Sequence, residues 1–147
     1  MGGGGRRFGR AVVTGALLFG VACSDDDDPT APTTTQVAGG YVATKFTTTT
    51  ATAGTVDLLA NGSSLTAEFA TDGNLTGHLT VPVAAANEDF AGKWRLENGD
   101  VVIEQLSNPL LFLGDVRFDV VGNTLVGDKD FSGFRVQLTL TKSTVAR

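Results

Sequence analysis

The stretch FRVQLTLT, from Phe134 to Thr141, places apolar side chains on every second position and polar side chains between them. Successive side chains of a β-strand point to opposite faces, so this period of two predicts a strand with one buried and one solvated face. The same alternation runs through segments 64–71, 74–82 and 114–121, whereas no window of the chain shows sustained helical spacing. The chain is therefore predicted to be all-β.

Turn signals separate the alternating segments. Asn61-Gly62, Asp72-Gly73, Asn98-Gly99 and Gly122-Asn123 supply residues that tolerate the positive φ of tight hairpin turns. Each strand is therefore expected to pair with the next one along the chain. Segment 83–89 is expected to be a longer connection, and segment 107–113 either caps one end of the sheet or forms a lip. The predicted strands are 40–48, 54–60, 64–71, 74–82, 91–97, 100–106, 114–121, 124–129 and 133–142.

A meander of eight or nine such strands must hide its apolar face. Closing into an antiparallel up-and-down barrel buries that face and removes the sheet edges. A two-sheet β-sandwich is the alternative fold, but Greek-key connections need longer crossings than most of these turns permit. The prediction is a single barrel over residues 39–147.

The alternation also predicts which aromatic residues face the inside of the barrel. Barrels of about eight strands either fill their interior with side chains or hold one small ligand. The candidate ligand-binding residues are therefore the predicted interior aromatics, which are equally compatible with ordinary core packing: Phe46, Phe69, Trp94, Phe118 and Phe134.

The first 22 residues are typical of a signal peptide. Arg6, Arg7 and Arg10 precede a short apolar run, Ala11 to Val21, that ends in small residues. A membrane-spanning helix needs about 20 apolar residues, so this run is too short to be one. We therefore expect an exported protein.

Cys23, the only cysteine, directly follows this leader. The sequence Val21-Ala22-Cys23 resembles a bacterial lipobox, although Gly20 stands where that motif usually has Leu. The resemblance implies cleavage before Cys23 and attachment of lipid to its thiol, which would anchor the protein in a membrane. Ser24 at the next position favours the outer membrane.

Residues 23–38 are predicted to comprise the lipidated Cys23 and a flexible linker after it. The run Asp25–Asp28 stays solvated, and the prolines and threonines after it offer little to bury. Three of the 11 Lys and Arg residues but none of the 16 Asp and Glu residues lie in the leader, so the mature chain is acidic. Nucleic acid needs clustered Lys and Arg, so it is not an expected partner.

The leader and the hairpin meander together resemble bacterial lipocalin-like lipoproteins. Gly92-Lys93-Trp94 matches the Gly-x-Trp of lipocalins, but it lies in the middle of the domain, and the first strand carries Gly40-Tyr41 instead. The resemblance implies an eight-stranded barrel with an apolar cup and does not name a ligand.

Signals for catalysis are weak. His78, the only histidine, alternates on the solvated face, and no Gly-x-Ser-x-Gly nucleophile motif is present. The carboxylate pairs Glu97/Asp100 and Asp128/Asp130 sit beside turns, where solvated charge is the usual explanation. We expect no enzyme, no metal and no cofactor.

The sequence therefore favours an envelope lipoprotein whose barrel binds a small hydrophobic molecule or an envelope protein. A structural or interaction module with a filled core is the alternative, and an envelope hydrolase is the third hypothesis.

Overall fold

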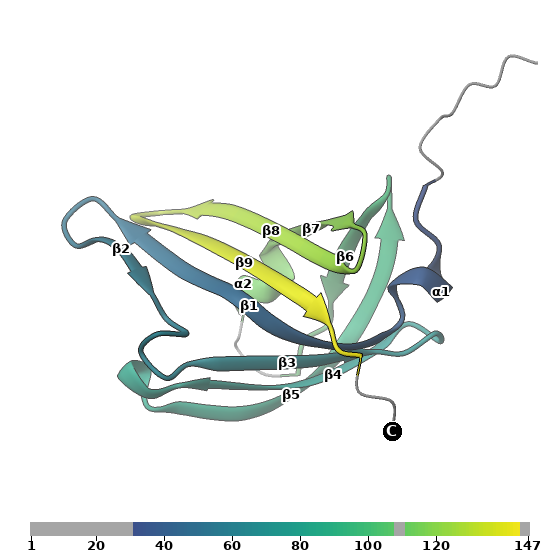
Figure 1. Ribbon diagram of the computed structural model, residues 1–147, viewed down its shortest axis with the longest axis horizontal. Coiled ribbons are helices and arrows are strands. Elements are labelled where there is room, and N and C mark those ends of the chain that lie inside the picture. Colours follow the sequence, from purple (N-terminus) through teal and green to yellow (C-terminus); the bar gives the residue numbers. More distant parts are fainter. Residues whose placement is uncertain (1–30, 108–110, 145–147) are drawn as a thin grey trace, which may run out of the picture.

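The computed structural model describes residues 31–107 and 111–144 and contains nine strands within them (Figure 1). The strand pairings among the described residues are antiparallel, and sequential strands pair along most of the sheet. The elements are α1 Thr34–Val37, β1 Gly39–Thr50, β2 Gly54–Asp57, β3 Ser64–Phe69, β4 Asn74–Val81, the 3₁₀ turn η1 Pro82–Ala84, β5 Ala86–Glu97, β6 Asp100–Glu104, α2 Leu111–Asp115, β7 Arg117–Val121, β8 Thr124–Phe131 and β9 Phe134–Lys142.

The sheet closes into an eight-stranded up-and-down barrel, with β2 as an additional strand. The long strand β1 makes the closure, because it pairs with β9 along most of its length. On its other edge, residues 39–42 pair with β3 and residues 47–50 pair with β2. The predicted barrel is confirmed, and the alternative sandwich does not form.

The inward and outward alternation of side chains in β1 is reversed partway along the strand. The register with β9 shifts between Ala43 and Lys45, which places one extra residue, Thr44, in β1. Such a bulge reverses the alternation, so Tyr41 and Phe46, five residues apart, are both buried. The hydroxyl of Thr44 stays on the outside, within 2.8 Å of the Thr141 hydroxyl.

Two glycines make room for phenyl rings inside the barrel. Gly77 pairs with Phe90, and Gly127 pairs with Phe118, in each case directly across two neighbouring strands. A Cβ atom at either glycine would overlap the ring of its partner. Each ring therefore covers the glycine opposite, which lets a strongly bent sheet stay closely packed.

The turn at Asn98-Gly99 has the positive φ angles that its sequence predicted. Both residues have positive φ, 56° and 91°, in the connection between β5 and β6. Two successive residues of positive φ match the type I′ turn, whose twist fits that of a hairpin. The Asn-Gly signal thus led to the correct strand pairing.

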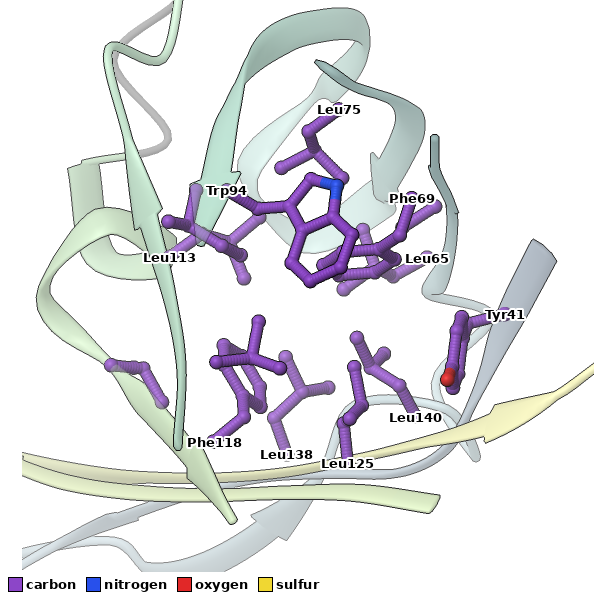
Figure 2. Packing of buried hydrophobic residues seen from close by; sticks show 14 of the residues in the cluster. Tyr41, Leu65, Phe69, Leu75, Trp94, Leu113, Phe118, Leu125, Leu138 and Leu140 are labelled. Atoms are coloured by element: carbon purple, nitrogen blue, oxygen red, sulfur yellow. The ribbon is translucent and has the colours of Figure 1, made fainter. Parts of the chain in front are cut away.

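Both short helices pack against the barrel. Val37 of α1 is fully buried, and the hydroxyl of Tyr41 donates a hydrogen bond of 2.7 Å to its carbonyl oxygen. The sequence prediction assigned Val37 to the linker, whereas the structure places it in the folded unit. Leu113 of α2 is 1% exposed, and Figure 2 shows it among the core side chains.

Several predicted segments differ from the structure. The predicted strand 114–121, for example, begins only at Arg117, after α2 ends at Asp115. The second strand ends at Asp57 rather than at residue 60, because the Asp57 carboxylate accepts hydrogen bonds from the backbone of Leu59 and Ala60 and starts a turn. Segment 83–89 is mostly strand, since η1 reverses the chain in three residues and β5 begins at Ala86. Segment 107–113 contains the start of α2, and residues 108–110 lie outside the described part.

Candidate functional site

A groove of about 1000 Å³ lies across β1, β3, β4 and β5. We call it the outer groove, because most of its lining side chains point away from the barrel interior. It is lined by residues that include Gly40, Glu68, Thr76, His78, Asp89 and Ala91.

Strand register brings these residues together. Gly40 pairs with Glu68, Glu68 with Thr76, and Thr76 with Ala91, so one row crosses four strands. Three of these four residues are small, so few side-chain atoms fill the groove along this row. A Cβ at Gly40 would lie 2.9 Å from the Oε2 atom of Glu68, so a larger residue there would displace the carboxylate.

His78 and Asp89 form the polar wall of the outer groove. They pair across β4 and β5, and Nδ1 of His78 lies 2.7 Å from Oδ1 of Asp89. Nε2 of the same ring lies 2.9 Å from Oδ1 of Asn87. These hydrogen bonds, the one to Asp89 foremost, raise the pKa of His78.

The same cluster resembles a hydrolytic triad only in its composition. Thr80 Oγ1 lies 3.3 Å from Nε2 of His78, but its hydroxyl donates to Oδ1 of Asn87 at 3.1 Å. A triad histidine must accept the proton of the nucleophile. Here Nδ1 faces the Asp89 carboxylate and Nε2 faces the Asn87 amide oxygen, so neither nitrogen is placed to accept the proton of the Thr80 hydroxyl.

The interior aromatics pack against one another. Phe69 is fully buried and lies edge-on to both Tyr41 and Trp94, with ring centroids 5.3 and 5.5 Å apart (Figure 2). The indole Nε1 of Trp94 donates a 2.9 Å hydrogen bond to the Ala70 carbonyl oxygen, so its polar atom is satisfied within the protein. Four of the five predicted interior aromatics are at most 4% exposed: Phe46, Phe69, Trp94 and Phe118.

The predicted burial of Phe134 is wrong. Its side chain is 39% exposed, because β9 begins at this residue, at the rim of the barrel. There it stacks on Phe131 across the β8–β9 hairpin, with ring centroids 5.0 Å apart. Alternation assigned the correct face to Phe134, but it carries no information about where the barrel wall ends.

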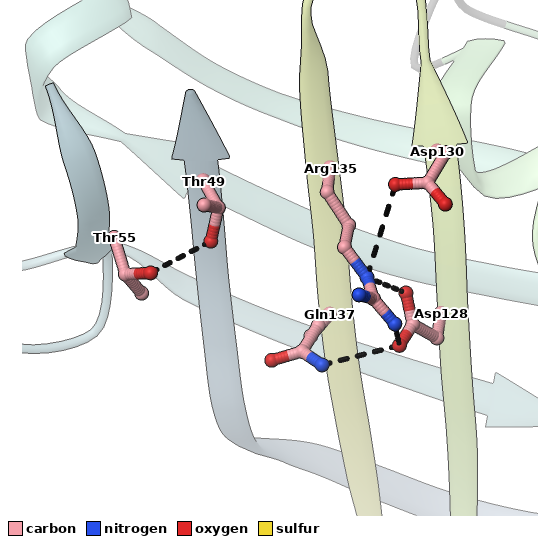
Figure 3. Close-up of polar contacts among 6 residues, drawn as sticks. All are labelled: Thr49, Thr55, Asp128, Asp130, Arg135 and Gln137. Atoms are coloured by element: carbon pink, nitrogen blue, oxygen red, sulfur yellow. Dashed lines mark hydrogen bonds and ion pairs between the residues drawn. The ribbon is translucent and has the colours of Figure 1, made fainter. Parts of the chain in front are cut away.

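Two of the carboxylates considered for acid–base chemistry, Glu97 and Asp128, lie in surface ion-pair networks. Asp128 binds Arg135 and Gln137 on the outer face of β8 and β9 (Figure 3), and the hydrogen bond from Arg135 lowers the pKa of Asp128. Glu97 pairs with Arg117 and Arg95, and the bond from Arg117 contributes most to lowering the pKa of Glu97. Carboxylates held ionised in this way are poor general acids.

Two further findings concern only the described residues. No group of three His, Cys, Asp or Glu side chains there has the geometry to hold a metal ion. No helix in the same part is long and apolar enough to cross a bilayer. The predicted lipid attachment at Cys23 lies outside the described residues, as do the signal peptide and most of the linker.

Sequence reasoning missed the outer groove, because its residues come from four strands and only the register joins them. The expectation that segment 83–89 is a connection also hid the pairing of Asp89 with His78. No protein-family model matches the chain. No curated protein matches it significantly either.

Proposed function

We propose that this protein is an exported, lipid-anchored binding module whose partner is a polar segment of another envelope protein, bound in the outer groove. The observation that carries the proposal is the groove itself. Its walls offer the Glu68 and Asp89 carboxylates and the hydroxyl of Thr76, so it suits hydrogen-bonding groups better than an acyl chain. The barrel is the rigid support that holds these strands in place.

The anchor part of the proposal is supported by the sequence alone. Lipid on Cys23 would hold the chain at a membrane, and two or three acyl chains are enough for stable attachment. About ten residues separate Cys23 from the N-cap of α1 at Thr33. This spacer would let the barrel turn its groove towards a neighbouring protein. The outer membrane is the favoured location of the anchor.

The chemistry of the groove supports a non-catalytic role. Its only histidine is held by two hydrogen-bond acceptors, and the adjacent threonine hydroxyl donates elsewhere. Recognition requires only complementary donors and acceptors, which such a cluster can supply. An envelope hydrolase remains the least favoured of the three hypotheses.

Photo-crosslinking in cells that export the protein tests the proposed site. A benzoylphenylalanine at Ala91, in the groove, should give a discrete crosslinked product, whereas the same residue at Val126, on the outer face of β8, should not. Gly40→Leu should reduce the Ala91 product, because the new side chain displaces Glu68. Equal products at Ala91 and Val126, or none at Ala91, would refute binding in the groove.

A small apolar ligand inside the barrel is the second candidate, and one observation favours it. Phe112 of α2 is only partly buried and stacks on Phe46, with ring centroids 5.9 Å apart. A partly exposed aromatic over the core could give way to a ligand. Titration with an apolar dye, followed through quenching of Trp94, tests this, and a folded protein that neither binds dye nor changes emission contradicts it.

A further inference from the structure

The strands of the barrel are not all paired over the same length, and the shortest ladder among the described residues joins β6 to β7. This ladder contains three residue pairs, whereas β5–β6 contains five, β7–β8 four and β8–β9 eight. The barrel therefore has fewer cross-strand interactions here than at the junctions on either side. We call the β6–β7 ladder the seam.

Two carboxylates face each other across the seam. Asp100 of β6 pairs directly with Asp119 of β7, and like charges at such positions are destabilising. Burial and the nearby Asp119 both raise the pKa of Asp100, burial being the larger cause. Arg117 partly offsets this effect and Glu97 adds to it, so these are the charged groups that face the pair.

The short helix α2, next to the seam in the chain, contributes a side chain that fills part of the barrel interior; we call α2 the plug. Strand β6 ends at Glu104 and β7 begins at Arg117, and the short helix α2 between them places Leu113 in the core. Among the described residues, no side-chain hydrogen bond or ion pair joins α2 to the barrel, so apolar contacts such as Phe112 on Phe46 hold it. Apolar contacts are non-directional, and a short helix held by them can leave without breaking a polar network.

We propose that the barrel opens locally at the seam, with α2 leaving the interior as β6 and β7 separate. Local opening is expected where a segment has few ladder hydrogen bonds and little cooperative support. Deprotonation of Asp100, whose pKa is raised in the folded barrel, favours the open form, so opening is easier at neutral than at mildly acidic pH. This inference does not depend on the outer groove or on any bound partner.

Hydrogen exchange of the full chain, read by mass spectrometry at low urea concentrations, tests the proposal. At pH 7 the amides of β6, β7 and α2 should exchange together, faster than those of β8 and β9 after correction for intrinsic rates. Leu113→Ala should speed exchange of this group further, because the plug loses buried surface. Exchange of β6 and β7 only by global unfolding, at the rate of β8 and β9, would overturn the proposal.

Charge variants test whether repulsion between Asp100 and Asp119, rather than the net charge of the protein, promotes opening of the seam. Asp119→Asn should slow exchange of the seam amides about two- to five-fold at pH 7, as expected for removal of a facing like charge. Glu68→Gln removes one negative charge from β3 and should leave these amides unchanged. An equal effect of both variants, or no effect of Asp119→Asn, would rule out the carboxylate pair as a cause of opening.

Discussion

Phe69 and Phe134 offer a sharp test of how the core is built, because alternation alone gives them the same role. Phe69 is fully buried between Tyr41 and Trp94, whereas Phe134 is 39% exposed at the rim. Replacing each with Ala removes the same atoms from the same kind of strand position. The two variants therefore differ mainly in burial.

The expected costs follow from these environments. Phe69→Ala leaves a cavity inside the barrel and should lower the free energy of unfolding by about 3–5 kcal/mol. Phe134→Ala loses its stacking on Phe131, for which about 0.5–1.5 kcal/mol is typical. A domain of this size is stable by only about 5–15 kcal/mol, so the first variant should lose a large share of its stability.

Urea denaturation followed by far-ultraviolet circular dichroism measures both costs. Circular dichroism is preferable to the emission of Trp94, since Phe69 contacts that indole directly. With a urea dependence of about 2 kcal/mol per molar, the midpoint of Phe69→Ala should fall by about 2 M. A loss below about 1 kcal/mol at Phe69, or equal losses at both positions, would refute the assignment of Phe69 to the centre of the core.

Three further predictions test other features. Gly127→Ala should cost about 1–3 kcal/mol in thermal unfolding, because the new Cβ overlaps the buried ring of Phe118, and an unchanged midpoint would contradict this packing. His78 should titrate above 6.5 in nuclear magnetic resonance spectra, and Asp89→Asn should lower its pKa. Because the folded-state pKa is raised, the stability that this pair adds is fully present below pH 6.5, the ordinary pKa of histidine, and is lost as the pH rises through the raised pKa. The advantage of wild type over Asp89→Asn should therefore shrink as the pH rises above 6.5. Cys23→Ala should release the mature protein from membranes on fractionation, and continued membrane association would exclude lipid on Cys23 as the anchor.

The all-β class and most strand positions could be predicted because they depend on local pattern. Leu138 and Leu140 are buried and Arg135 is exposed, as the opening stretch of alternation requires. The hairpin at Asn98-Gly99 is likewise local, since positive φ is a property of those two residues. Closure of the barrel could be inferred from the need to hide an apolar face.

Features that depend on distant partners could not be read in this way. The bulge at Thr44 reverses the alternation in β1, and nothing in the run of threonines that follows marks its position. Segment 83–89 lacks apolar alternation, because Glu88 occupies the position of β5 that shares a face with the buried Phe90. Helix α2 is too short to show a helical period, so its apolar residues could indicate only a cap or a lip.

The two faces of the barrel wall are under different constraints, and this difference favours the outer face as the place of the proposed recognition. Changing a buried residue such as Phe69 or Leu138 removes several kilocalories per mole from a small total. Most exposed positions, including Glu68 and Ala91 in the groove, can change at a cost within about 0.5 kcal/mol. Binding specificity can therefore be altered in the outer groove while the fold is retained, whereas the packed aromatics inside leave little freedom for the same adjustment.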